Sequence, residues 1–271
     1  MRCAIKDWFT EEYGFFGDFY YICDNSFEGP YKDNCLSRTE RTKNEVNMIV
    51  EMLGVKPGDT LFDCPCGWGR HSIELAEKGV EVKAIDLNRQ YLNLLREDLT
   101  KKPLDIQSKV IASRNDMRSI PLQEQFDFGI NMFSAFGFFN DDENFQVVCN
   151  FYNLLKPNGK LLIHLDFNAE RLIQGFGFDY APKRNIFYKG TNYTLDVEKE
   201  YHDDDKRLHG LWKLTDEKGA VTSKMYSFRI YNTEEMRDLL IRAGFRSTEF
   251  YSSNQKTQCF DDIDTVIIAE K

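Results

Sequence analysis

Apolar and polar residues follow two alternating patterns along the first two thirds of the chain. Short apolar runs predict buried strands, and the stretches between them, with an apolar residue every three or four positions, predict helices. The strand-like runs are residues 60–62, 80–85, 106–112, 126–131 and 160–164. The helical stretches are residues 39–53, the stretch that ends at Gly79, and residues 87–101 and 141–155. This alternation is typical of an α/β fold with a doubly wound parallel sheet.

The pattern changes near residue 186, where strand-like runs follow one another without helices between them. These runs cover residues 186–188, 193–201, 208–214 and 221–230, and polar turns separate them. They predict antiparallel hairpins. A helix at 233–244 and strands at 247–251 and 265–269 then return to the first pattern.

We therefore expect three parts. Residues 1–38 form an aromatic N-terminal arm, residues 39–183 with 231–271 form a Rossmann-like domain, and residues 184–230 form an antiparallel β insertion near the C-terminus, over the acceptor site. The arm either folds over a cleft as a lid or packs on the domain.

Composition narrows the function. The 271 residues carry a net charge of −9 and no basic run, so nucleic acid is not an expected partner. No apolar run is long enough for a bilayer, so no membrane partner is expected either. Seven irregularly spaced cysteines and a start without a signal-peptide core indicate a cytoplasmic protein with reduced thiols. Cys64 and Cys66 are too close and too isolated for a zinc site, so we expect no metal.

The chain is organised around residues 60–88. A strand ends in Asp63, a loop with Gly67 and Gly69 leads into a helix, and a second strand ends in Asp86. A strand–loop–helix–strand–acid unit holds a nucleoside at the mouth of a parallel sheet. Asp86 is placed to accept hydrogen bonds from two ribose hydroxyls.

The loop favours one nucleoside over another. A dinucleotide fingerprint requires glycine at the position of Pro65 and again at the position of Ser72 or Ile73. An acid such as Asp63 repels a pyrophosphate but attracts an amino group. These features favour S-adenosylmethionine over a nicotinamide cofactor.

At this point the chain resembles class I S-adenosylmethionine-dependent methyltransferases of the small-molecule branch. The resemblance covers roughly residues 39–271 and departs from the wider superfamily at Pro65. Its motifs are Asp63-Cys64-Pro65-Cys66-Gly67-Trp68-Gly69-Arg70-His71-Ser72, Ile85-Asp86-Leu87-Asn88, Asn115-Asp116-Met117-Arg118, Asn131-Met132-Phe133-Ser134-Ala135-Phe136-Gly137-Phe138, Ser227-Phe228-Arg229-Ile230-Tyr231 and Ala243-Gly244-Phe245.

The resemblance implies roles for these residues. The methionine part would contact Asp63, Cys66, Gly67, Gly69, Asn131 and Met132, with Arg38 or Arg41 at its carboxylate. The ribose would contact Asp86, and the adenine would contact Leu87, Asp116 and Met117. For each acid the alternative is a solvent-facing carboxylate at a strand end or helix cap.

Methyl transfer requires alignment and exclusion of water more than side-chain chemistry, although an oxygen nucleophile also needs a base. His164, at the end of the fifth strand, is the best base candidate, unless its ring is buried and only hydrogen-bonded. Arg229 and Tyr231 either line the acceptor pocket or form a salt bridge and a core contact. We expect His71 to be structural, and His202 and His209 to be solvated beside an acidic turn.

These observations predict methyl transfer from S-adenosylmethionine, with S-adenosylhomocysteine as product, to an oxygen or nitrogen of a small molecule such as a secondary metabolite or amino sugar. The protein is expected to act as a monomer or homodimer. The alternatives are a nicotinamide-dependent oxidoreductase and a non-catalytic S-adenosylmethionine-binding protein. A methyltransferase for RNA or protein is a nearer alternative that the charge balance discourages.

Overall fold

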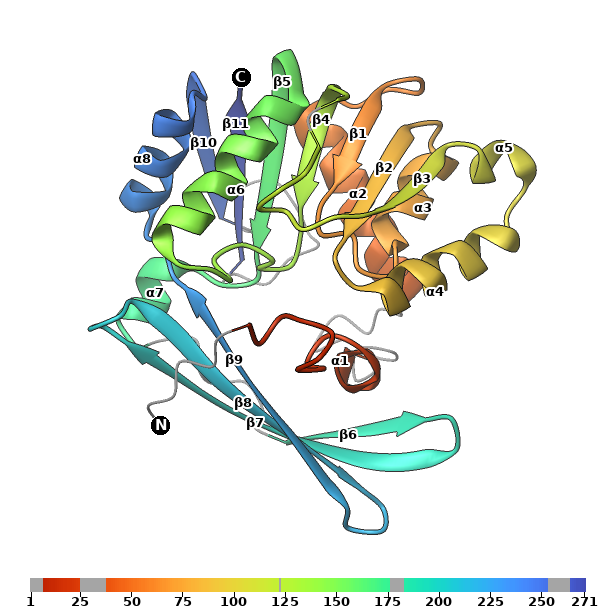
Figure 1. Ribbon diagram of the computed structural model, residues 1–271, viewed down its shortest axis with the longest axis vertical. Coiled ribbons are helices and arrows are strands. Elements are labelled where there is room, and N and C mark those ends of the chain that lie inside the picture. Colours follow the sequence, from red (N-terminus) through yellow and green to blue (C-terminus); the bar gives the residue numbers. More distant parts are fainter. Residues whose placement is uncertain (1–6, 25–37, 122, 176–182, 253–263) are drawn as a thin grey trace. The chain divides into compact units, whose positions relative to one another are not determined.

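A computed structural model describes residues 7–24, 38–121, 123–175, 183–252 and 264–271 (Figure 1). Residues 1–6 and 25–37 of the expected arm lie outside this part. The chain divides into two compact units, one of Met1–Arg41 with Arg171–Ile230 and one of Thr42–Glu170 with Tyr231–Lys271. We describe each unit by itself.

The larger unit contains a seven-stranded sheet in the order β10-β11-β5-β4-β1-β2-β3. Its strands are β1 (Thr60–Asp63), β2 (Glu81–Asp86), β3 (Val110–Arg114), β4 (Phe126–Asn131), β5 (Leu155–Leu165), β10 (Ser247–Ser252) and β11 (Thr265–Glu270). The strands from β1 to β5 pair in parallel, whereas β11 runs antiparallel to both β5 and β10. The expected doubly wound, Rossmann-like sheet is therefore confirmed.

Helices accompany this sheet in the expected alternation. They are α2 (Arg38–Leu53), α3 (Arg70–Glu77), α4 (Arg89–Thr100), α5 (Leu104–Gln107), α6 (Asp141–Leu154) and α8 (Thr233–Ala243). The apolar stripe of α2, with Val46 and Ile49, packs with Leu61 of β1 and Ile130 of β4 in one buried cluster. A second cluster joins α3 and α4 to β2 and β3. Burial of these stripes is the main stabilising contribution to the unit.

The strand order reverses at β1, because the chain goes from β1 to β2 on one side and reaches β4 on the other. Asp63 is in register with Ala84 of β2 and with Ile130 of β4. The carboxyl ends of all three strands therefore meet at one edge. Ligands of open α/β sheets bind at such a switch point.

The smaller unit contains a four-stranded antiparallel sheet in the order β6-β7-β8-β9. Its strands are β6 (Lys183–Tyr188), β7 (Thr191–His202), β8 (Arg207–Asp216) and β9 (Val221–Arg229), and two short helices are α1 (Asp18–Asp24) and α7 (Ala169–Ile173). This confirms the antiparallel insertion. The described part of the arm packs on its strands, since the Phe15 ring lies 5.5 Å from Trp212 and 5.4 Å from Tyr226.

Two elements differ from the sequence prediction. The third strand begins at Val110, four residues later than expected, because residues after Pro103 first form α5. The fifth strand begins at Leu155 and includes the expected turn, with Asn158 in the left-handed region at φ 65° and a register shift opposite β4. Within the described ranges no helix has the length and apolarity needed to cross a membrane.

Candidate active site

The loop between β1 and α3 is held by the strands beside it. The Cys64 amide donates to the Ile130 carbonyl at 3.0 Å, and the Cys66 amide donates to the Ile85 carbonyl at 2.9 Å. Gly67 and Gly69 have φ values of 56° and 76°, a region that favours glycine. The loop is thus a fixed turn at the switch point.

Asp63 ends β1 as a buried carboxylate. Its Oδ2 accepts a hydrogen bond from Ser72 Oγ at 2.6 Å, whereas its buried Oδ1 has no partner among the described residues. Burial raises the pKa of Asp63 to about 7, against the lowering effects of Ser72 and the Arg70 charge, and the Asp86 charge adds to the rise. An acceptor oxygen left unpaired in this way is suited to a cationic or N–H group of a ligand.

Asp86 orders the loop from the end of β2. Its Oδ2 accepts a hydrogen bond from the Gly67 amide at 2.8 Å, and its Oδ1 accepts one from the Asn88 amide at 2.8 Å. The carboxylate therefore fixes both the glycine loop and the start of α4, which Asn88 caps. Leu87, between them, is partly buried.

Asn131 and Met132 lie at the end of β4, and both are buried. The Asn131 Nδ2 donates to the Cys64 carbonyl at 2.9 Å. Its buried Oδ1 has no partner within the described part of the chain. A second unpaired acceptor therefore lies next to the strand that ends in Asp63.

A pair of residues that follows β4 adopts an unusual backbone conformation. Phe133 and Ser134 have φ values of 58° and 51°, although neither is glycine. The Ser134 amide donates to the His164 carbonyl, and its Oγ forms hydrogen bonds with Asp166. Strained non-glycine residues held by such bonds cluster at functional sites. The sequence gives no indication of this strain.

Asp116 is bound by a neighbouring arginine. Arg118 donates to it through its amide and its guanidinium, at 2.7–3.2 Å. Partial burial acts to raise the pKa of Asp116, but these bonds outweigh it and the net shift is downward. Arg118 also bonds Glu143 and lies 4.4 Å from the Phe139 ring. Met117, beside them, is buried.

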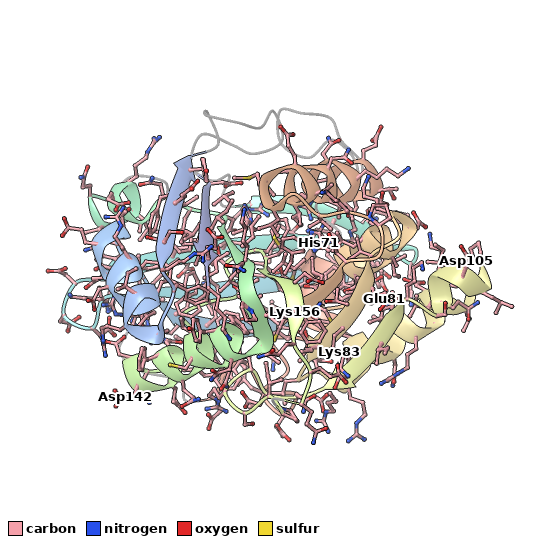
Figure 2. All side chains as sticks on the ribbon, turned by 90° about the horizontal axis from the view of Figure 1, so that it is seen from above. His71, Glu81, Lys83, Asp105, Asp142 and Lys156 are labelled. Atoms are coloured by element: carbon pink, nitrogen blue, oxygen red, sulfur yellow. The ribbon has the colours of Figure 1, made fainter. Side chains whose placement is uncertain are left out.

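A buried cluster that the sequence did not reveal surrounds His71. Glu45 of α2 is 1% exposed and accepts from Arg70, and its Oε2 lies 2.9 Å from His71 Nε2. The His71 ring stacks on Phe133, and the Arg70 guanidinium lies 4.5 Å from the same ring. Figure 2 labels His71, which lies near the start of α3. It therefore has the expected structural role, and only the adjacent Arg70-His71 pair hinted at a buried acid partner.

His164 is fully buried, with both ring nitrogens in hydrogen bonds. Its Nδ1 accepts from the Phe133 amide at 3.2 Å, so the proton lies on Nε2, which donates to Asp264 at 3.3 Å. A base must present a lone pair to the substrate. The geometry therefore favours the structural alternative for His164 and does not support its assignment as the base.

Tyr231 also makes structural bonds. Its hydroxyl donates to Asp141 Oδ1 at 2.7 Å and accepts from Asn144 Nδ2 at 3.1 Å, which connects the residues before α8 to the start of α6. Tyr231 is only 6% exposed.

Replacing Tyr231 by phenylalanine should lower the free energy of unfolding by about 1–2 kcal/mol, because one buried and one partly buried hydrogen bond are lost. Urea denaturation measures this. Turnover at saturating substrates should stay within roughly twofold of wild type. A tenfold loss of turnover at unchanged stability would instead make Tyr231 a catalytic residue.

Three predicted arginines remain: Arg229, and Arg38 and Arg41 in the first turns of α2. Arg38 forms an ion pair with Asp24 at 3.4 Å. Arg229 is buried at the end of β9 and donates to the neighbouring Ile230 carbonyl. Arg41 is buried in the first turns of α2. The contacts and burial of these arginines do not identify a ligand.

S-adenosylmethionine carries an ammonium, a carboxylate, a ribose and an adenine, and the residues at the switch point fit the first of these directly. Two acceptor oxygens, on Asp63 and Asn131, are buried there without a partner among the described residues. A Cβ added to Gly67 would meet no atom of the described residues within 4 Å, so the glycine loop borders open space in that part of the structure. Arg118 already binds Asp116, which makes the adenine contact the least direct part of the expected site.

Comparisons with known proteins show which family the chain resembles. The family model described as mycolic acid cyclopropane synthetase matches residues 18–198. A glycine/sarcosine N-methyltransferase of Aphanothece halophytica is 27% identical over 244 residues, which cover 88% of this chain and 86% of that protein. A glycine/sarcosine/dimethylglycine N-methyltransferase of Actinopolyspora halophila is 25% identical over 244 residues, and the match covers 40% of that longer protein.

Solved structures show the same fold. An amino pentose methyltransferase from Micromonospora echinaspora superposes with a TM-score of 0.67 at 18% identity, over 94% of this chain and 97% of that one. A methyltransferase from Streptomyces caelestis also gives 0.67 at 18% identity, over 84% and 88%. The family match covers well over half of the residues. The chain therefore belongs to the class I S-adenosylmethionine-dependent methyltransferases, within the family that the cyclopropane synthetase model describes, and it is a methyltransferase enzyme.

Proposed function

We propose that this enzyme transfers a methyl group from S-adenosylmethionine to the nitrogen of a small amine. The expectation from sequence left oxygen and nitrogen open. Nitrogen is favoured because two relatives that match 88% of the chain are named as N-methyltransferases of glycine and its methylated forms. The structural neighbour named as an amino pentose methyltransferase shares the fold.

The single observation that carries the cofactor assignment is the unpaired Oδ1 of Asp63, which we propose accepts a hydrogen bond from the cofactor's ammonium group. Asn131 Oδ1 is a second acceptor for the same part of the molecule. A carboxylate can accept about four hydrogen bonds, so the bonds from Gly67 and Asn88 do not by themselves prevent Asp86 from binding a ribose.

The other assignments are proposals of the same kind. We place Cys66, Gly67, Gly69 and Met132 near the methionine part, Leu87, Asp116 and Met117 near the adenine, and Arg41 at the carboxylate.

The cofactor supplies a methyl group that its sulfonium has already activated. The protein must then hold both reactants in line and exclude water. Asp63 and Asp86 would fix the two ends of the nucleoside amino acid against the turn at the switch point. The strained residues Phe133 and Ser134 border the same edge of the sheet and would shape its rim.

The histidines of this unit also favour an amine. His71 Nε2 lies against Glu45, and both ring nitrogens of the buried His164 are already in hydrogen bonds. A hydroxyl acceptor usually needs a base near neutral pH. A neutral amine already carries its lone pair, and its extra proton can leave to water after the transfer.

The experiment is incubation of the enzyme with methyl-labelled S-adenosylmethionine and four acceptors: glycine, sarcosine, an amino sugar and a phenol. Mass spectrometry of the products identifies the methylated atom. We expect label on nitrogen. Label only on the phenolic oxygen would overturn the choice of nitrogen, and absence of cofactor binding would overturn the whole assignment.

Replacing Asp86 by alanine should weaken cofactor binding at least tenfold, because both the ribose contact and the acceptor for the Gly67 amide are lost. Calorimetric titration with S-adenosylhomocysteine measures this. Asp105→Ala, at an exposed acid of α5, is the matched control and should leave affinity unchanged. If affinity of the Asp86 variant stayed within a few-fold of wild type, the ribose assignment would be wrong.

A further inference from the structure

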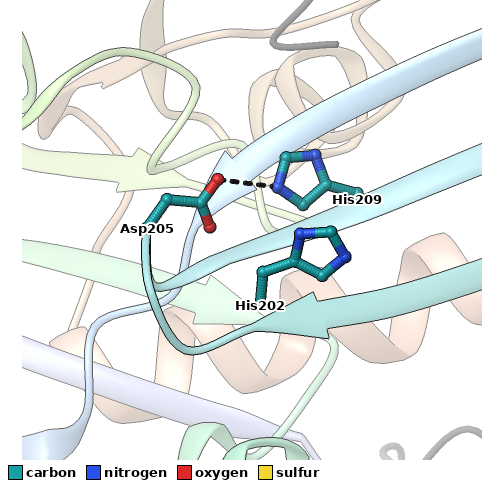
Figure 3. Close-up of side chains that lie close together, drawn as sticks. All are labelled: His202, Asp205 and His209. Atoms are coloured by element: carbon teal, nitrogen blue, oxygen red, sulfur yellow. Dashed lines mark hydrogen bonds and ion pairs between the residues drawn. The ribbon is translucent and has the colours of Figure 1, made fainter. Parts of the chain in front are cut away.

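The turn between β7 and β8 brings together two histidines and an aspartate that methyl transfer does not use. In the pairing of β7 with β8, Glu200 lies opposite His209 and His202 lies opposite Arg207. Opposed residues and their second neighbours share one face of a sheet. His202 and His209 therefore project from the same face as diagonal neighbours, and Asp205 reaches them from the turn (Figure 3).

We propose that His202, Asp205 and His209 bind a zinc ion. The three side chains each offer one ligand atom, and these atoms lie within 4.8 Å of one another. The imidazole rings are 4.5 Å apart between centroids. Two imidazoles and one carboxylate are a ligand set that zinc accepts, with a fourth position for water or a further carboxylate.

The present contacts show that His209 and Asp205 already face each other, whereas one ring nitrogen of His202 faces a further acid, Glu200. His209 Nε2 lies 2.9 Å from Asp205 Oδ2, and His202 Nε2 lies 3.0 Å from Glu200 Oε2. An ion would replace the proton between His209 and Asp205. The other Asp205 oxygen accepts from the Arg207 amide at 3.0 Å, an outer bond that orients the carboxylate.

Burial and charge are compatible with a cation. The His202 and His209 side chains are 18% and 10% exposed, so they are not solvated as the sequence suggested. Two further acids, Asp203 and Asp204, occupy the same turn. Arg207, which lies opposite His202 in the register, directs its guanidinium to Ser227 at 2.7–2.8 Å.

Binding of zinc requires the three ligand atoms to move slightly closer together. Tetrahedral zinc with bonds of about 2.0–2.1 Å places its ligands roughly 3.3 Å apart, less than the present maximum. The turn between the strands is exposed from Asp203 to Lys206 and can supply this movement. The ion would cross-link the ends of β7 and β8 beside the carboxyl end of β9, where the Ile230 amide donates to the Lys206 carbonyl.

The sequence prediction of no metal rested on ligand spacing. His202 and His209 are seven positions apart with Asp205 between them, which matches no compact zinc motif. Only the antiparallel register brings them together. The proposal is independent of the acceptor and of the cofactor site.

The test uses the full chain after treatment with a chelator and dialysis. Zinc is titrated in competition with a chromophoric chelator. We expect one strong site, at least tenfold weaker in Asp205→Asn and at least a hundredfold weaker in the double variant His202→Gln with His209→Gln. Asp203→Asn, in the same turn, is the matched control and should bind like wild type.

The chain also has seven cysteines, so the ligand type must be measured directly. X-ray absorption of the wild-type zinc complex should show nitrogen and oxygen neighbours at about 2.0–2.1 Å. A sulfur shell at about 2.3 Å, or equal affinity in the double variant, would overturn the proposal. If the double variant did not fold, the wild-type absorption spectrum alone would decide.

Discussion

Replacing Asp63 by asparagine is expected to weaken binding of S-adenosylmethionine by about 100-fold, because a charge-assisted hydrogen bond inside a buried site is worth a few kcal/mol. The variant should still fold, since asparagine can accept the bond from Ser72 through its carbonyl oxygen. Calorimetry with the wild type and the variant measures the difference. Glu81→Gln, at an exposed acid that begins β2, is the matched control and should bind normally.

The same variant should be more stable than wild type at neutral and alkaline pH. The folded pKa of Asp63 is about 7, whereas its ordinary value is 3.8. At a pH between these two pKa values, the folded protein holds a proton on Asp63 that the unfolded chain has released. Asp63 therefore lowers the free energy of unfolding progressively as the pH rises from about 4 to about 7. The full cost is on the order of 4 kcal/mol, at about 1.4 kcal/mol for each pKa unit. Urea unfolding at pH 5 and pH 8 should show this slope in wild type and not in Asp63→Asn.

Cofactor binding should offset the loss of stability that the ionised Asp63 causes at higher pH. An ammonium group beside Asp63 favours the ionised carboxylate, so binding near pH 6 should release a proton from the protein. Titrations in buffers of different ionisation enthalpy count that proton. Affinity that does not increase as pH rises toward 8 would contradict the pairing.

Gly69→Ala should lower the free energy of unfolding by roughly 2–5 kcal/mol. The residue has φ 76°, which costs an alanine about 1–2 kcal/mol. Its new Cβ would lie 2.2 Å from Leu95 Cδ1, and overpacking of a buried side chain costs about 1–3 kcal/mol more. Thermal and urea unfolding measure the loss.

The variant Gly67→Ala separates the cost of the left-handed backbone from the cost of the contact with Leu95. Gly67 has φ 56°, but a Cβ there meets no atom within 4 Å. Its stability should therefore fall by about 1–2 kcal/mol only. Equal losses in the two variants would mean that the contact with Leu95 does not restrict the loop.

Local pattern predicted the elements that support the site. Apolar runs that end in Asp63 and Asp86 gave the strand ends, and parallel pairing then required them to meet at one edge. The expected ribose acid also orders the loop through the Gly67 amide, a second task that a linear pattern does not show.

The remaining features depend on tertiary contacts. Glu45 lies in an ordinary amphipathic helix, and only the packing of α2 shows that it is the buried partner of Arg70 and His71. His164 was predicted as a base from its position at a strand end. That position also buries it between Phe133 and Asp264, which favours a structural role.

The most direct test of the account is a crystal structure of the enzyme with S-adenosylhomocysteine. We predict that the ligand lies across the carboxyl ends of β1 and β2, with its amino group at hydrogen-bond distance from Asp63 Oδ1 and its ribose at Asp86. A ligand bound elsewhere, or an amino group directed away from Asp63, would contradict the account.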